Sequence, residues 1–277
     1  MKKKSFLLLL AGFFLLFIII LIIFLYPAYK NFFNKEIVNI DNGLTLVIGG
    51  GGNSGIVVGE KTAVVIDTKL SSNADDLFKL AKSKAGNKPI IVINTHYHTD
   101  HTKGNKLYKG SPIYIGNYDL SFLKSELKDE NMPTNFVKDS LTIDIGGEKV
   151  KMFNLGRAHT FSDLVVLLEN RKYLFSGDLI FQRVNPVLKR ESGADVGLWL
   201  KSLEHIIGME IVKIIPGHGK PGGKEIVKEL IRYFEDMKVA ASDKSKEDFQ
   251  KHKYAGWMKI PGMASPEKTI EYIRNGK

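Results

Sequence analysis

The segment at residues 95–101, THYHTDH, constrains the fold of this chain more than any other stretch. It follows the run PIIVIN, which has the length and β-branched content of a buried strand. Alternate side chains of extended backbone point the same way, so His96 and His98 can reach one ion together. Asp100 and His101 lie where the chain is expected to turn into a short helix, and they suit a second, neighbouring ion. Imidazole and carboxylate ligands for two such ions favour zinc.

The pattern H-x-H-x-D-H at residues 96–101 resembles the signature of the metallo-β-lactamase superfamily. Four further segments resemble the other motifs of that family and occur in the family's order. They are VVIDT at 64–68, GRAHT at 156–160, FSGD at 175–178 and PGHG at 216–219. The resemblance covers residues 43–237, most of the chain beyond its N-terminal segment.

The resemblance implies a dinuclear metal site with a role for each ligand. The first ion would be held by His96, His98 and His159, the second by Asp100, His101 and His218, and Asp178 would bridge the two. Asp67 would support the ligand loop from behind it. Lys69 stands where the family usually has glycine, which bears on the turn after Asp67. The implied cofactors are two Zn²⁺ ions per chain, with iron or manganese as alternatives.

Each of these residues, taken singly, has an ordinary structural explanation. A lone histidine is usually structural or exposed, Asp100 could cap a helix, and Asp178 could be a turn residue. The seven histidines nevertheless concentrate in the motifs, and only His205 and His252 fall outside them. A joint metal site is therefore the favoured interpretation, and His205 and His252 are expected on the surface.

The N-terminus carries a long apolar segment. Residues 6–26 contain no charge and would span about 30 Å as a helix, one hydrocarbon thickness. The run exceeds the 7–15 residues usual in a cleaved signal peptide, and no small-x-small site follows it. The segment is therefore expected to be a signal-anchor, a single transmembrane helix in an inner or plasma membrane. Lysines at positions 2–4 favour a cytoplasmic N-terminus, which places the catalytic domain in a periplasm or outside the cell.

The predicted organisation has four parts. Residues 1–29 form the basic end and anchor, 30–36 a linker, 37–240 the metallo-β-lactamase-like domain, and 241–277 a helical extension packed on it. Within the domain, clusters of strand-like runs alternate with helix-like segments, as in two sheets packed face to face with helices outside. The resemblance implies the four-layer αβ/βα sandwich of the family, with the ligand motifs at strand ends along one edge.

Local patterns predict further details. A helix is expected at residues 72–85 with Ser72 as its cap, and the glycine-rich segment at 49–53 is expected to form a mobile hairpin flap near the metal site. Residues 184–193 are expected to form a substrate loop. The formal charge of +10 is spread over lysines interleaved with acidic residues, so no nucleic-acid partner is expected.

These features predict a membrane-anchored dinuclear zinc hydrolase of a small-molecule substrate. Two zinc ions lower the pKa of a bridging water to near 7 and polarise the bond to be cleaved. Asp100 can orient the resulting metal-bound hydroxide and accept its proton, so it is the candidate catalytic residue. The bond would be an ester, thioester, lactone or amide.

Asp178 narrows the set of family members whose activity this chain is expected to share. Metallo-β-lactamases often carry Cys or Ser at this position, whereas an aspartate is similar to hydroxyacylglutathione hydrolases and related enzymes. The chain contains no cysteine, so a thiolate ligand and a thiol nucleophile are excluded. β-Lactamase or phosphodiesterase activity is an alternative, as is an iron-dependent oxidoreductase similar to the sulfur dioxygenases, which use much the same ligands.

Overall fold

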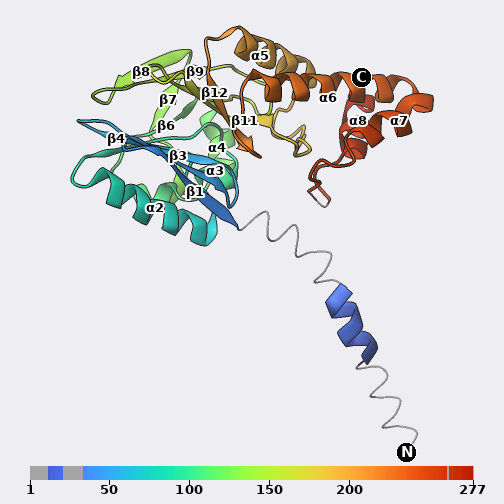
Figure 1. Ribbon diagram of the computed structural model, residues 1–277, viewed down its shortest axis with the longest axis horizontal. Coiled ribbons are helices and arrows are strands. Elements are labelled where there is room, and N and C mark those ends of the chain that lie inside the picture. The colour runs from blue at the N-terminus through green and yellow to red at the C-terminus, as the bar shows by residue number, and fades with distance from the viewer. Residues whose placement is uncertain (1–11, 21–33, 261, 277) are drawn as a thin grey trace, which may run out of the picture.

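The computed structural model describes residues 12–20, 34–260 and 262–276. Two β-sheets pack face to face, helix α2 lies on the outer side of one sheet, and helices α5 and α6 cover the other (Figure 1). The predicted αβ/βα sandwich is confirmed for this part of the chain.

The first sheet has seven strands, which follow one another in chain order. They are β1 (Lys35–Asp41), β2 (Leu44–Gly49), β3 (Ser54–Val58), β4 (Ala63–Ile66), β5 (Ile90–Ile93), β6 (Ile113–Gly116) and β7 (Asn135–Val137). Strands β1 to β4 form an antiparallel meander, and β4 to β7 are parallel. Because β5 is parallel to both neighbours, the ligand loop that follows it lies at the end of the sheet where the carboxyl ends of β4, β5 and β6 meet.

The second sheet has five strands in the order β12-β11-β10-β9-β8. They are β8 (Ser140–Asp144), β9 (Lys149–Asn154), β10 (Leu164–Leu168), β11 (Tyr173–Phe181) and β12 (Lys213–His218). Only the β11–β12 pair is parallel. The parallel pair ends with His218 beside Phe181, so two predicted ligand motifs reach the same edge.

The helices connect and cover the sheets. They are α2 (Ser71–Ala85), α3 (Thr99–Thr102), α4 (Leu120–Glu126), α5 (Val196–Gly208), α6 (Lys224–Ser242), α7 (Glu247–Lys253) and α8 (Pro266–Arg274), with short 3₁₀ turns η1 (Asn105–Tyr108), η2 (Asp129–Asn131) and η3 (Lys244–Lys246). The helix predicted at residues 72–85 is confirmed, and it buries one apolar face through Ala74, Leu77, Ala81 and Ala85. The predicted Ser72 cap is wrong: Leu70 occupies the cap position and no side chain bonds the first turn.

The core between the two sheets is made of side chains from both. β10 has the sequence LVVLL and is buried along its whole length, as expected of a strand covered on both faces. Phe175 of β11 is 2% exposed and lies in the same cluster as Leu46, Val57 and Ile66 of the first sheet. This cluster joins the two halves of the sandwich.

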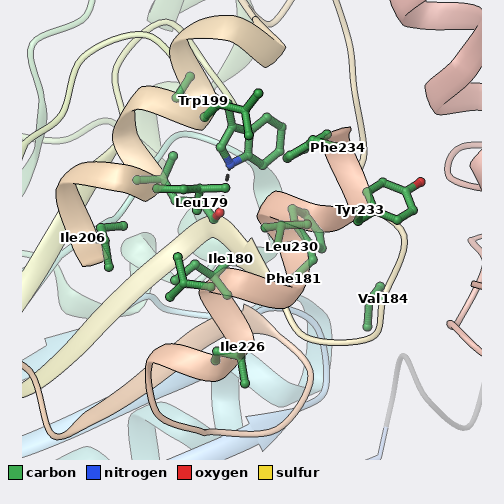
Figure 2. Close-up of a cluster of buried hydrophobic side chains, with 14 of the residues drawn as sticks. Leu179, Ile180, Phe181, Val184, Trp199, Ile206, Ile226, Leu230, Tyr233 and Phe234 are labelled. Carbon is green, nitrogen blue, oxygen red and sulfur yellow. Dashed lines mark hydrogen bonds between the residues drawn. The ribbon is translucent and has the colours of Figure 1, made fainter. Parts of the chain in front are cut away.

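A second cluster lies under α5 and α6 (Figure 2). Trp199 of α5 is fully buried, and its indole N–H donates to the carbonyl of Leu179 in β11 over 2.8 Å. Phe181 and Phe234 surround the same ring. The indole therefore ties helix α5 to the strand that carries Asp178.

The C-terminal region packs on α6. The rings of Tyr233 and Trp257 stack at 4.8 Å between centroids, and Tyr254 meets both rings edge-on. The Tyr233 hydroxyl also lies 2.8 Å from the Thr269 hydroxyl of α8. Residues from α6 to α8 thus share one core.

The predicted anchor at residues 6–26 lies partly outside the described residues. Of this run the structure describes residues 12–20, which are helical and expose large apolar side chains such as Phe13 and Leu16. No helix among the described residues is long and apolar enough to cross a bilayer. The described part of the chain therefore gives the anchor no support.

We expect Phe175→Ala to lower the free energy of unfolding by about 3–5 kcal/mol, because it removes a buried ring from the contact between the sheets. The matched control is Phe249→Ala, at a ring that is 68% exposed, which should change it by about 0.5 kcal/mol or less. Urea unfolding followed by circular dichroism measures both. Equal effects of the two substitutions would contradict the assignment of Phe175 to the core.

Candidate metal centre

The segment 95–101 begins just after β5 and runs into the short helix α3. His96 is buried directly after the strand, and the carbonyl of His98 accepts from the backbone N–H groups of His101 and Thr102. The Thr102 hydroxyl adds a bond to the same carbonyl over 3.0 Å. These bonds hold the turn that separates two histidines before it from Asp100 and His101 after it.

Three imidazoles converge on one point. Nε2 of His96 and Nε2 of His159 lie 3.0 and 3.1 Å from Nδ1 of His98. His159 reaches this point from the segment between β9 and β10. We call His96, His98 and His159 the first group. Burial lowers the pKa of His98 to about 4 and that of His159 to about 3, and it holds the pKa of His96 well below its usual value. All three are therefore neutral at pH 7, the form that binds metals.

Asp100, His101 and His218 form the second group. Oδ2 of Asp100 lies 3.2 Å from Nε2 of His218 and 3.6 Å from Nε2 of His101. Burial opposes charge on these imidazoles, but the nearby carboxylates outweigh it. They raise the pKa of His218 to about 9 and that of His101 well above its usual value. The same imidazoles hold the pKa of Asp100 below its ordinary value despite burial.

Asp178 lies between the two groups. Its Oδ2 is 3.4 Å from Nε2 of His159 and 3.8 Å from Nε2 of His96. Its Oδ1 is 3.2 Å from Nε2 of His101 and 3.4 Å from Nε2 of His218. The structure thus brings all seven sequence-predicted ligands together, with one carboxylate oxygen facing each group.

Two glycines allow this position of Asp178. Gly177 has φ +50°, and a Cβ there would come within 2.4 Å of the Thr95 hydroxyl. A Cβ at Gly217 would come within 2.0 Å of Oδ1 of Asp178. Gly177 of the FSGD motif therefore lets β11 approach the ligand loop, and Gly217 of the PGHG motif lets β12 approach Asp178.

The donor set fits bound cations. Nε2 of His101 and Oδ1 of Asp178 are buried and make no hydrogen bond among the described residues, although they lie 3.2 Å apart. Within each group the candidate ligand atoms all lie within 4.8 Å of one another, counting Asp178 with the first. Imidazole and carboxylate donors at such spacing suit zinc.

Asp67 fixes the ligand loop from behind, as predicted. Its carboxylate accepts from the backbone N–H and the hydroxyl of Thr95, both over 2.8 Å. It also accepts from Nδ1 of His101 over 2.8 Å, because a carboxylate can only accept. This bond leaves Nε2 of His101 directed at the site, the usual arrangement around a metal-binding histidine.

The glycine-rich segment differs from its prediction. Gly50, Gly51 and Gly52 are buried, so the turn between β2 and β3 is not an exposed flap. Asn53 donates from its side-chain amide to the carbonyls of Pro216 and Gly219, on either side of His218. This contact could not be predicted, because it joins residues more than 160 positions apart.

Two residues beside the ligands were not among the predicted site residues. The Ser192 hydroxyl accepts from Tyr97 over 2.8 Å and lies 3.4 Å from Nε2 of His98. The ring of Trp199 meets that of His159 at 5.1 Å between centroids. Neither residue belongs to one of the five family motifs. Tyr97 is buried, and His205 and His252 are exposed as expected.

The predicted substrate loop at 184–193 is fastened at several points. Val184 is buried and pairs with Met258, and Arg190 donates to the carbonyl of Tyr272 over 2.7 Å while its guanidinium lies over the Tyr272 ring. The C-terminal region therefore holds the loop that brings Ser192 to His98.

The fold and the site define an αβ/βα protein with histidine and aspartate groups suited to a pair of metal ions. A family model described as "Metallo-beta-lactamase superfamily" matches residues 47–218, more than half of the chain. The chain belongs to the metallo-β-lactamase superfamily.

Curated relatives agree with this assignment. A metallo-β-lactamase type 2 of Bacteroides fragilis is 26% identical over 63% of this chain and 72% of its own length. One of Bacillus cereus is 25% identical over 63% and 70%. A protein named "Probable metallo-hydrolase", from Methanocaldococcus jannaschii, is 26% identical over 62% and 89%.

Solved structures agree as well. TMB-1 is 26% identical, with a TM-score of 0.61 over 72% of this chain and 96% of the other. A metallo-β-lactamase from Pontibacter korlensis has a TM-score of 0.62 over 72% and 98%, and at 21% identity it supports the fold alone. The predicted closeness to hydroxyacylglutathione hydrolases gains no support from these relatives and stays a prediction.

We expect the protein, freed of metal with a chelator, to be most stable near pH 6.5 to 7. Free histidine has a pKa of about 6.5. The lowered pKa values of His98 and His159 mean that the unfolded chain binds more protons below that pH, so stability falls as pH drops toward 4. The raised pKa of His218 stabilises fully below pH 6.5, and this contribution is lost as pH rises through about 9. Melting temperatures from pH 4.5 to 9.5 test the profile, and a flat or monotonic curve would contradict it.

Proposed function

We propose that this protein is a dinuclear zinc hydrolase that cleaves an ester, thioester, lactone or amide bond in a small molecule. The observation that carries the proposal is the position of Asp178, whose two carboxylate oxygens face the two groups of ligands at 3.2 to 3.8 Å. A buried carboxylate placed in this way suits a bridge between two cations.

The seven residues would divide the ligation between them. The first group, with its three neutral imidazoles, would hold one ion, and the second group would hold the other. Two bound zinc ions would make a water molecule acidic enough to react at neutral pH and would polarise the bond to be cleaved. Thr95 and Asp67 are buried behind the ligands and keep them oriented.

Asp100 is the residue best placed to handle the proton. Its side chain is 17% exposed, compared with 5% for Asp178, so it reaches the open side of the site. Its carboxylate can accept a hydrogen bond from the attacking water and take up the proton that the water releases. His218, 3.2 Å from Oδ2, holds the carboxylate in that position.

The names of the relatives favour one amide for testing first. The relatives from Bacteroides fragilis and Bacillus cereus are named metallo-β-lactamases, and a β-lactam is a strained cyclic amide. Asp178 stands where many β-lactamases carry Cys or Ser, which is why thioesters, esters and lactones belong in the same comparison. An iron-dependent oxidoreductase on the same ligand set is the second candidate, and metal analysis separates the two.

We expect the full chain, purified in a mild detergent with zinc present, to bind two zinc ions and to hydrolyse at least one of a thioester, a lactone, an ester and a β-lactam. Asp178→Ala should weaken the binding of both ions and lower the rate of hydrolysis by more than about 100-fold. Loss of a residue that only supports a metal ligand already lowers metal affinity or activity by about 10- to 100-fold. Metal content is measured by elemental analysis and the rate by absorbance.

The matched control is Asp75→Ala, an exposed aspartate on α2, which should change neither measurement. Fewer than one bound ion per wild-type chain would refute the dinuclear proposal. Unchanged metal content and rate in Asp178→Ala would refute the bridge. Iron in place of zinc, with oxygen consumption and no hydrolysis, would favour the oxidoreductase.

We also propose that residues 6–26 anchor the protein in an inner or plasma membrane, with the catalytic domain on the far side. The support is the uncharged apolar run in the sequence, preceded by the lysines at positions 2–4. The chain should stay in the membrane pellet after carbonate extraction. Replacing Leu15 and Leu16 with lysine should release it, since each lysine costs about 3 kcal/mol in a membrane helix. A soluble mature protein that begins near residue 30 would refute the anchor.

A further inference from the structure

Lys69 is a buried lysine beside the candidate metal centre. Its side chain is 0% exposed and its backbone has φ +60°, a left-handed conformation that is strained for a non-glycine residue. Burial lowers the pKa of its ammonium to about 7. Among the described residues it forms no ion pair, so both the strain and the burial need another compensation.

The ammonium of Lys69 binds the glycine-rich turn between β2 and β3. Nζ donates to the carbonyls of Gly49 and Gly52, each over 2.6 Å. A protonated amine has three N–H donors and a neutral amine has two, so either form can make both bonds. The side chain of Lys69 therefore fastens both ends of the turn.

This turn packs directly on the second group. A Cβ on Gly52 would lie 2.3 Å from Cε1 of His101, and a Cβ on Gly51 would lie 3.2 Å from Cβ of Asp100. The backbone of the turn is therefore in contact with both side chains. A shift of the turn by a fraction of an ångström would move Asp100 and His101.

The same turn also holds the third member of the second group. Asn53, the residue after Gly52, donates from its backbone N–H to the carbonyl of Gly217 over 2.7 Å. Its side-chain amide donates to the carbonyls of Pro216 and Gly219 over 2.8 and 2.9 Å. Its side-chain oxygen accepts from the N–H of Gly49 over 2.8 Å. The segment that carries His218 is thus bonded to the turn that Lys69 fastens.

The geometry points to Lys69 as a positioning residue for the second metal ion: it fixes the turn at residues 49–52, and the turn sets Asp100, His101 and His218. The inference rests on the proposed dinuclear function and deepens it. No hydrogen bond between the turn and the first group occurs among the described residues. Loss of Lys69 should therefore weaken the binding of the second ion and leave the binding of the first unchanged.

The test is a titration of the chelator-treated full chain, in a mild detergent, with Zn²⁺ against a competing fluorescent chelator and with Co²⁺ by visible absorption. Lys69→Met keeps a side chain of similar length and the same backbone strain, and it removes the N–H donors. Lys69→Gly removes the donors and relieves the strain, so it decides the question if Lys69→Met does not fold. The control is Lys79→Met, an exposed lysine on α2.

We expect the second equivalent of metal to bind about 10- to 100-fold more weakly in both Lys69 variants. The first equivalent should keep its affinity and its Co²⁺ spectrum, and Lys79→Met should titrate like the wild type. A purely structural role would instead lower the melting temperature without separating the two ions.

Wild-type titration curves in folded Lys69 variants, or equal weakening of both ions, would overturn the inference. Failure of both variants to fold would also overturn it, because Lys69 would then serve folding. If the wild type itself binds fewer than two ions, the proposed function fails rather than the role of Lys69.

Discussion

The position of Asp178 between two sets of buried imidazoles is the constraint on which the rest of the structure depends. A carboxylate and five imidazoles that share one buried pocket must have their charges compensated, and each oxygen of Asp178 faces one set of rings. Asp178 reaches this position from β11, just after Gly177. The ligand loop reaches it from the carboxyl end of β5 in the first sheet. The face-to-face packing of the sheets, built on Phe175 and its neighbours, brings these two segments together.

Much of this arrangement could be predicted from the sequence, because the ligand motifs follow strand-like runs and resemble a known family. Residues 90–93 form the strand expected before the ligand loop, and the strand at 213–218 ends in His218. Two details were wrong, one at the start of a helix and one where distant segments meet. Ser72 does not cap its helix, which starts one residue earlier at Ser71, after Leu70. The glycine-rich turn resembles a flexible flap in sequence, yet a lysine twenty positions later bonds its carbonyls.

The two groups also differ in how they are supported, and no pattern in the sequence indicates this. The first group consists of neutral imidazoles packed against rings, as Trp199 packs on His159. The second group mixes carboxylate and imidazole and takes its shape from Asp67, the turn at 49–52 and Asn53. Ring packing and the hydroxyls of Thr95 and Ser192 thus surround the first group, whereas the second group adds to the stacked ring of Phe181 a network of backbone and side-chain hydrogen bonds.

The contact between Trp199 and His159 has a consequence for following metal binding in solution. The chain has two tryptophans, and the indole of Trp199 lies against a first-group imidazole while its N–H is engaged with the strand of Asp178. Trp257 instead stacks on Tyr233 in the C-terminal cluster. An indole in that position carries an intrinsic optical signal, so the light that Trp199 emits would report on the filling of the neighbouring site without any added label.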